Sequence, residues 1–278
     1  MSEYYVLVFV VGSVLHTLPE GKAVWGVTSL NNLLYVLRNK TSQQISVYDT
    51  DSYRLQRRLN VPRLDGMSDM TACACNLCIY ISGGDDKCVH RVQVQVTGDF
   101  VTEWPVFDAA DGLSITDTHS VLVTCRDVRK MKEFTTDGQL LRQIELPRKV
   151  VSPWHTIQLS SGEFLVCHGN IRHTQGVCLT GSDGHIVKSY SGRKRRYFQR
   201  ISFFRMAVDR NGFIFVVDRN VILLSPGLTF VREVVSSDQL EWIPNGLFLD
   251  VDRRRLYVAE NDLENDEQIA GRVVVFSV

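Results

Sequence analysis

The chain has 278 residues, 44% of them hydrophobic, so it is long enough to bury a large core. Its 31 basic and 31 acidic residues give a formal net charge of zero, which excludes a global electrostatic attraction to nucleic acid or to membranes. No linker or low-complexity tract divides the sequence, so a single domain over residues 1–278 is expected.

The first apolar stretch, residues 4–11 (YYVLVFVV), is interpreted as a strand. It follows an acid, Glu3, instead of a basic region, and it is too short to span a bilayer. Its β-branched and aromatic residues also favour a strand. The alternative is a remnant of a targeting signal in residues 1–13, which would make the protein secreted. No other segment is a membrane candidate, so no membrane partner is expected.

Six apolar runs of similar pattern recur along the rest of the chain. Their central residues are separated by 45, 43, 43, 49 and 42 positions, and they are Tyr35, Tyr80, Val123, Val166, Phe215 and Tyr257. A period of roughly 40 to 50 residues in an all-strand sequence is typical of a β-propeller, in which each repeat is a small sheet that buries its faces against its neighbours.

The repeats predict an all-β, six-bladed β-propeller with four-stranded antiparallel blades. We expect the blades at about residues 25–62, 67–107, 111–148, 153–192, 203–236 and 244–278. The sixth blade reaches Val278 without a fourth strand. An N-terminal strand at residues 14–18 is therefore expected to complete the last blade and close the ring, which removes exposed sheet edges.

The seven cysteines are an odd number without the density of a disulfide framework, which favours a reducing compartment and a cytoplasmic location. The cluster of Cys73, Cys75 and Cys78 has no second pair of ligands at zinc-site spacing, so no metal is expected there. Small core residues are the preferred interpretation for Cys75, Cys78, Cys125, Cys167 and Cys178.

Residues at the starts of the innermost strands are expected to surround the mouth of the central channel. We expect them to form a binding face of Trp25, Asp69, Trp154, His155, Arg205 and Asn245. Cys167 and His168 are adjacent in a strand and point to opposite faces, so they do not form a nucleophile and base pair. No catalytic residue and no cofactor are assigned. The first hypothesis is a non-enzymatic binding or scaffold module for a protein or peptide partner.

One strongly basic stretch, RKRRYFQR at residues 193–200, connects the fourth and fifth blades. Basic side chains interleaved with aromatic rings can neutralise phosphates and stack on bases, although a solvated loop has the same composition. RNA binding is therefore an alternative function, with the candidate residues Arg193, Lys194, Arg195, Arg196, Tyr197, Phe198 and Arg200.

The fifth repeat, residues 203–228 (FFRMAVDRNGFIFVVDRNVILLSPGL), resembles an NHL repeat. Asp209, Gly212, Asp218 and Asn220 match the family pattern, whereas Val221 follows directly where the family usually has an extra residue and an arginine. Weaker similarity extends over the other repeats. The resemblance implies a six-bladed propeller like that at the C-terminus of TRIM-NHL proteins, which bind RNA or protein. The sequence contains no RING, B-box or coiled coil, so ubiquitin-ligase activity is not carried over.

A second resemblance involves PNG at residues 244–246 and LYVAEN at residues 256–261. These segments are similar to the gluconolactonase and senescence-marker-protein propellers, in which a Glu, two Asn and an Asp hold a metal at the channel mouth. The resemblance implies Glu20 and Asn245 as metal ligands. The place of the Asp has Arg205, a cation that would repel a divalent metal. A metal-dependent lactonase or esterase-like hydrolase is the third hypothesis.

Overall fold

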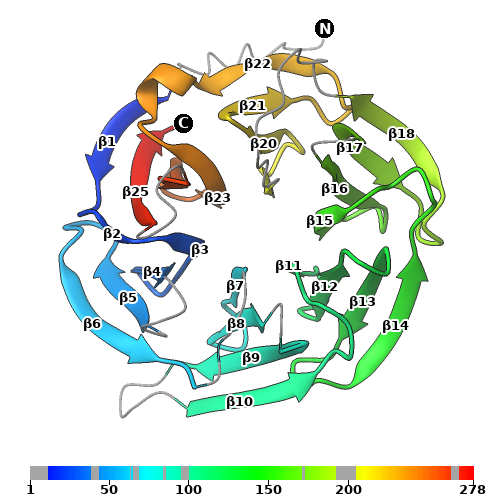
Figure 1. The fold of residues 1–278 in the computed structure, drawn as a ribbon, viewed down its shortest axis with the longest axis horizontal. Coiled ribbons are helices and arrows are strands. Elements are labelled where there is room, and N and C mark those ends of the chain that lie inside the picture. The colour runs from blue at the N-terminus through cyan, green and yellow to red at the C-terminus, as the bar shows by residue number, and fades with distance from the viewer. Residues whose placement is uncertain are drawn as a thin grey trace, which may run out of the picture.

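The computed structural model describes residues 12–38, 44–62, 64, 69–83, 86–94, 100–170, 173–191, 205–263 and 269–278. Six antiparallel sheets are arranged as blades in a ring around a central axis (Figure 1). In each blade the first strand lies nearest the axis and the fourth strand lies at the rim. The expectation of an all-β, six-bladed propeller with four-stranded blades is confirmed.

The first three blades follow the chain in order. Blade one contains β3 (Val24–Leu30), β4 (Leu33–Arg38), β5 (Gln44–Asp49) and β6 (Leu55–Asn60). Blade two contains β7 (Met70–Cys73), β8 (Cys78–Gly83), β9 (Cys88–Gln93) and β10 (Phe100–Pro105). Blade three contains β11 (Gly112–Ile115), β12 (Val121–Cys125), β13 (Lys130–Phe134) and β14 (Leu140–Glu145).

The last three blades repeat the arrangement. Blade four contains β15 (Pro153–Gln158), β16 (Phe164–Asn170), β17 (His173–Thr180) and β18 (Ile186–Ser191). Blade five contains β19 (Met206–Val208), β20 (Ile214–Asp218), β21 (Asn220–Leu224) and β22 (Phe230–Val235), followed by a 3-10 turn, η1 (Ser237–Gln239). Blade six contains β23 (Ile243–Asp250), β24 (Arg255–Asn261) and β25 (Ala270–Ser277).

The N-terminal strand closes the ring, as expected. β1 (Ser13–Thr17) pairs antiparallel with β25 and becomes the fourth strand of blade six, and the short β2 (Gly21–Lys22) pairs with the other end of β25. Leu18, directly after β1, is fully buried against blades six and one. Closure therefore joins the two ends of the chain by hydrogen bonds and by apolar packing. Residues 1–11, which were expected to contain a further strand, lie outside the described residues.

Among the described residues the core consists of six apolar clusters, each lying between two consecutive blades. The strand alternation explains this arrangement, because successive side chains of the second strands point to opposite faces. In β4, for example, Tyr35 packs towards blade two, whereas Leu34 and Val36 pack towards blade six. All six central residues of the sequence repeat are buried. No blade can bury both faces without its neighbours, so the ring is the stable unit.

The cysteines differ from expectation at one position. Cys75 is exposed, because residues 74–77 form the turn between β7 and β8 instead of continuing a strand. Its Sγ lies 3.2 Å from His119 Nε2, in the corresponding turn of blade three. The other cysteines interpreted as core residues are buried, and none of the seven, all of which are described, forms a disulfide.

The described part of the chain contains no helix with the length and apolarity needed to cross a membrane.

Candidate functional site at the channel mouth

The candidate site lies at one end of the ring, where every innermost strand begins. Antiparallel pairing reverses direction at each strand, so the connections into the first strands and the turns between second and third strands meet at this end. We call this end the mouth face. Trp25, Asp69, Trp154, Arg205 and Trp242 all lie within two residues of the start of an innermost strand. The sequence repeat therefore brings residues that are far apart in the chain to one end of the axis.

Asp69 and Arg205 form a buried ion pair at this face. Arg205 Nε lies 3.3 Å from Asp69 Oδ1, and both side chains are less than a tenth exposed. Asp69 Oδ1 also accepts a hydrogen bond from the backbone N–H of Met70, and Asp69 Oδ2 accepts one from the N–H of Leu113. Arg205 donates to the carbonyl oxygen of Asp111. These contacts link blades two, three and five across the axis.

His155 joins the same cluster from β15. Its Nε2 lies 2.9 Å from the carbonyl oxygen of Leu113, which makes this nitrogen the donor, and 3.9 Å from Asp69 Oδ2. Burial lowers the pKa of His155, and Arg205 acts in the same direction, whereas Asp69 and the hydrogen bond to Leu113 act against them. The imidazole is therefore held as a neutral donor that ties blade four to blade three.

A glycine allows this close packing. A Cβ on Gly112 would lie 2.3 Å from the carbonyl oxygen of Trp154 and 2.9 Å from the Cα of His155. Any side chain at position 112 would push β15 away from β11. The contact between His155 and the carbonyl oxygen of Leu113 therefore depends on the absence of a side chain at Gly112.

Trp154, on the innermost strand of blade four, forms a stack with Arg126 at the mouth face. The guanidinium carbon of Arg126 lies 4.4 Å from the centre of the Trp154 ring, and the indole N–H donates to the carbonyl oxygen of Gly169. Asp111 lies 3.5 Å from Arg126 and accepts its backbone N–H. Burial raises the pKa of Asp111, while Arg126 acts against that rise. Both members of the stack are thus fixed by further contacts.

A second stack of the same kind lies on blade six, where Arg272 lies 5.1 Å from the centre of the Trp242 ring. Arg272 also donates to the fully buried carboxylate of Glu260 and lies 2.6 Å from Glu241. Glu260 accepts the backbone N–H groups of Glu241 and Trp242. Burial raises the pKa of Glu260, and Arg272 and these N–H groups limit the rise.

The remaining candidates lie between blades six and one. The Asn245 side chain is buried and donates to the carbonyl oxygen of Val24, which also accepts a hydrogen bond from Asn261. Trp25 follows Val24 and packs against the core between blades one and two. The structure therefore brings Asp69, His155 and Arg205 into one cluster, with Asn245 and Trp25 in a second region of the ring.

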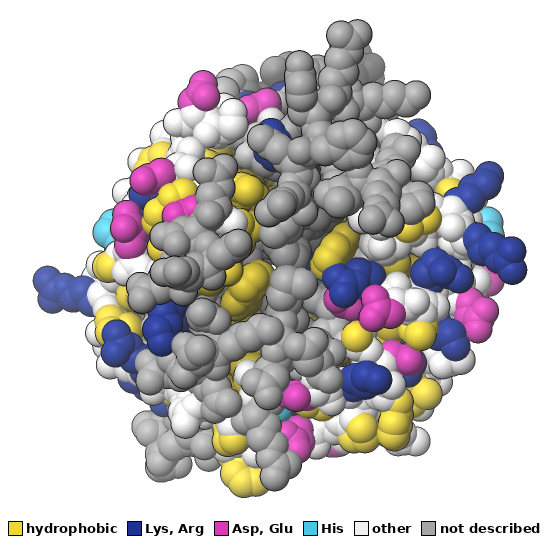
Figure 2. Space-filling view, viewed as in Figure 1, with side chains coloured by type: hydrophobic (Ala, Val, Ile, Leu, Met, Phe, Trp, Pro, Cys, Tyr) yellow, Lys and Arg dark blue, Asp and Glu magenta, His cyan; other side chains and the backbone are white. Residues whose placement is uncertain are grey.

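Two other sets of sequence candidates are placed as follows. Glu20 is exposed and lies 3.8 Å from Arg272, whereas Asn245 is buried against Val24, so the two expected metal ligands have different partners. The basic residues of the RNA hypothesis, at positions 193–200, lie outside the described residues. Basic and acidic side chains lie side by side over the described surface seen in Figure 2.

Sequence reasoning missed three participants: Arg126, Trp242 and Glu260. Trp242 and Glu260 each have a signal in the repeat, because Trp242 directly precedes the first strand of blade six and Glu260 is the next-to-last residue of the second, both at the mouth end. Arg126 occupies the start of the turn after β12, at the same end of blade three. Aligning the repeats by their strand ends, instead of by their central residues, would have identified all three.

No protein-family model matches the chain, and no curated protein matches it. Among solved structures, a catalytically inactive variant of virginiamycin B lyase from Staphylococcus aureus superposes with a TM-score of 0.62 at 11% identity, over 95% of this chain and 98% of that one. Hydrazine synthase from Kuenenia stuttgartiensis gives a TM-score of 0.63 at 14% identity, over 91% and 80%. The β-propeller domain of Cps50 (Swd1) from Myceliophteria thermophila gives 0.61 at 10% identity, over 96% and 99%. At these identities the likeness shows the fold, and the chain has the six-bladed β-propeller fold.

Proposed function

We propose that the protein is a non-enzymatic binding module that receives a protein or peptide partner on the mouth face. The observation that carries the proposal is the pair of arginine–tryptophan stacks, Arg126 with Trp154 and Arg272 with Trp242. Tryptophan and arginine are the residues enriched among those that dominate the energy of protein interfaces. Two such pairs on one end of the ring offer two anchoring points for a single partner.

The stacks are held in place before a partner binds. The Arg126 side chain is 25% exposed and Arg272 is 16% exposed, and each is also bound by carboxylates. Because these arginine side chains are already ordered, binding a partner costs less side-chain conformational entropy than it would with freely rotating arginines. The central cluster serves this face as a support, since Asp69, His155 and Arg205 contact one another and the backbone.

Two features of the sequence, the NHL-like fifth repeat and the cysteine content, are consistent with this function. The resemblance of the fifth repeat to an NHL repeat supports a propeller that binds protein or RNA. Asp209 in that repeat has a clear local role, because its carboxylate accepts the N–H groups of Asn211 and Phe213 and shapes the turn after β19. The odd number of cysteines, without the density of a disulfide framework, supports a cytoplasmic location.

The test is selection of peptides from a random display library on the immobilised full chain, followed by Kd measurements by fluorescence anisotropy. Trp154→Ala and Trp242→Ala are each expected to weaken the selected peptides by about 30-fold, the equivalent of about 2 kcal/mol. Tyr53→Ala is the matched control, because Arg255 lies 5.6 Å from the Tyr53 ring in the turns at the opposite end of the ring. Loss of binding in the Tyr53 variant, with both tryptophan variants unaffected, would overturn the proposal.

A further inference from the structure

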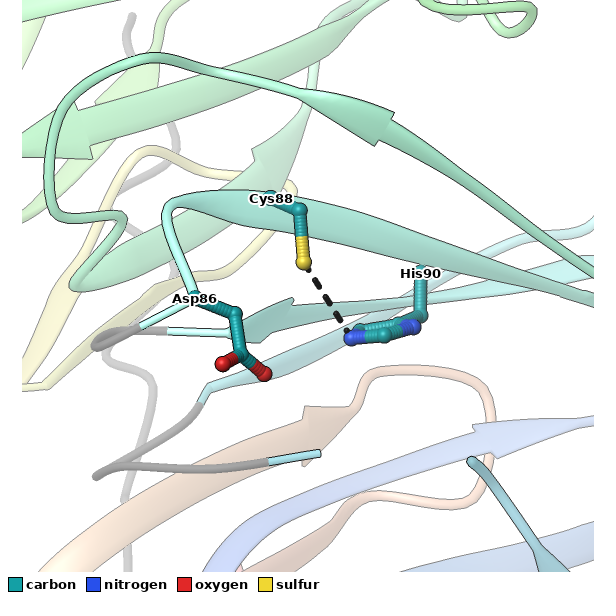
Figure 3. A group of neighbouring side chains, drawn as sticks. All are labelled: Asp86, Cys88 and His90. Atoms are coloured by element: carbon teal, nitrogen blue, oxygen red, sulfur yellow. Dashed lines mark hydrogen bonds between the residues drawn. The ribbon is translucent and has the colours of Figure 1, made fainter. Parts of the chain in front are cut away.

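Three potential metal ligands project together at the beginning of β9 in blade two. Cys88 and His90 are alternate residues of β9, so strand geometry places their side chains on the same face, and Asp86 lies in the turn just before the strand. Their carboxylate, thiol and imidazole atoms all lie within 4.8 Å of one another, and the side chains point to a common point (Figure 3). The spacing D-x-C-x-H is present in the sequence, but it was not identified there as a candidate metal site.

The distance between the thiol and the imidazole already suits a cation. Cys88 Sγ lies 3.3 Å from His90 Nε2. Zinc bond lengths of about 2.3 Å to sulfur and 2.0 Å to nitrogen place tetrahedral ligand atoms about 3.5 Å apart. With a proton on Nδ1, His90 accepts the thiol proton of Cys88 at Nε2, so this proton occupies the place where a cation would bind both atoms.

A carboxylate lies behind the imidazole. Glu103, the cross-strand partner of His90 on β10, has its Oε2 3.5 Å from His90 Nδ1. Metal-binding histidines commonly direct their second nitrogen to a carboxylate, which fixes the tautomer and orients the ring. This carboxylate favours the proton on Nδ1 and leaves Nε2 for the cation. His90 itself is fully buried, so its ring is held by the surrounding core.

A glycine leaves the necessary space. A Cβ on Gly83 would lie 3.1 Å from Cys88 Sγ, 3.3 Å from the Asp86 Cβ and 3.5 Å from Asp86 Oδ2. Gly83 pairs with Cys88 across the strands and is not among the residues with positive φ, so the backbone does not require glycine there. The missing side chain instead forms a cradle that the thiol and the carboxylate share.

We propose that Asp86, Cys88 and His90 bind a divalent cation of borderline softness, with zinc as the best fit. A thiolate and an imidazole select zinc over calcium or magnesium, which prefer oxygen ligands. Zinc with one thiolate, one carboxylate and a neutral imidazole has no net charge, which limits the cost of partial burial. The thiol proton passes to solvent as the sulfur–metal bond forms. Asp86 is exposed, so a water completes the four-coordinate site from that side.

The test is titration of the chelator-treated full chain with Co²⁺, followed by absorption spectroscopy. The proposal predicts one equivalent of four-coordinate cobalt with a thiolate charge-transfer band, displaced by zinc and not by calcium or magnesium. Cys88→Ser is expected to abolish the charge-transfer band and to weaken binding at least 100-fold. Cys75→Ser is the matched control, because Cys75 also lies beside a histidine but belongs to no group of three potential ligands among the described residues.

The second variant is Glu103→Gln, which removes the carboxylate behind the imidazole and leaves all three ligands. It is expected to retain the charge-transfer band and to weaken cobalt binding by about 10- to 100-fold. The Glu103 side chain is 44% exposed, so the variant is expected to fold normally, and its thermal unfolding midpoint in the presence of chelator checks this. Absence of the charge-transfer band in the wild-type protein, its persistence in Cys88→Ser or its loss in Cys75→Ser would overturn the proposal.

Discussion

Arg205 and Asp69 belong to blades five and two, which face each other across the ring, and yet Arg205 Nε lies 3.3 Å from Asp69 Oδ1 (Figure 1). The ion pair joins opposite sides of the propeller at the mouth face. Neighbouring blades are already held by apolar clusters, whereas this pair acts between blades that share no cluster. It therefore couples the two halves of the ring.

Removing the arginine should destabilise the fold. Arg205→Met leaves the buried carboxylate of Asp69 without its cationic partner, and such losses cost about 3–5 kcal/mol of the free energy of unfolding. Urea denaturation followed by tryptophan fluorescence measures the change. Arg210→Met is the control, because Arg210 and Asp252 form an ion pair that is about three-quarters exposed on both sides, and no measurable change is expected there. Equal effects of the two variants would contradict this role of Arg205.

His155 should make stability depend on pH. Burial lowers its pKa below the ordinary histidine value of 6.5, so the folded side chain stays neutral while the unfolded chain takes up a proton. The unfolded state then binds more protons, and the contribution of His155 is present above pH 6.5 and is lost as the pH falls below it.

The comparison of wild type with His155→Gln isolates this effect from other titrating groups. The decrease in the free energy of unfolding between pH 7.5 and pH 5.5 should be about 1 kcal/mol smaller in the variant, as measured by urea denaturation at both values. His185→Gln, at an exposed position, controls for the loss of a histidine in general. Parallel pH profiles for wild type and His155→Gln would exclude this assignment.

Closure of the ring should depend on Leu18 far more than on Leu15. Leu18 is fully buried between blades six and one, whereas Leu15 in β1 is 50% exposed. Leu18→Ala should lower the free energy of unfolding by about 2–5 kcal/mol, because it removes buried methyl groups and leaves a cavity. Leu15→Ala should have a small effect. Thermal and urea unfolding of the two variants provide the measurement, and similar effects would show that the closing strand contributes through its backbone pairing alone.

The basic stretch at residues 193–200 gives a separate prediction for RNA. If it forms an RNA-binding surface, random single-stranded RNA should bind tightly at low salt and much more weakly at higher salt, because counterions are released on binding. Replacing its five basic residues by alanine should abolish that binding. Filter binding at two salt concentrations measures both effects. Absence of binding at low salt would leave the protein or peptide partner as the proposed ligand.

The sequence alone determined the architecture, because the repeat interval and the strand alternation are both local patterns. The interval predicted six blades, and the missing fourth strand of blade six predicted closure by the N-terminal strand, which β1 confirms. Each candidate at the start of an innermost strand could be placed on the mouth face for the same reason. Cys75 was assigned wrongly because a turn at residues 74–77 interrupts the alternation.

The tertiary structure alone decided which of these residues meet. The contact between Arg205 and Asp69 joins opposite blades, and the stack of Arg126 on Trp154 joins neighbouring ones. The partner of His90 is likewise set by the pairing of β9 with β10, which places Glu103 beside it. These distances depend on how the blades twist and pack around the axis, and that geometry is a property of the closed ring rather than of any single repeat.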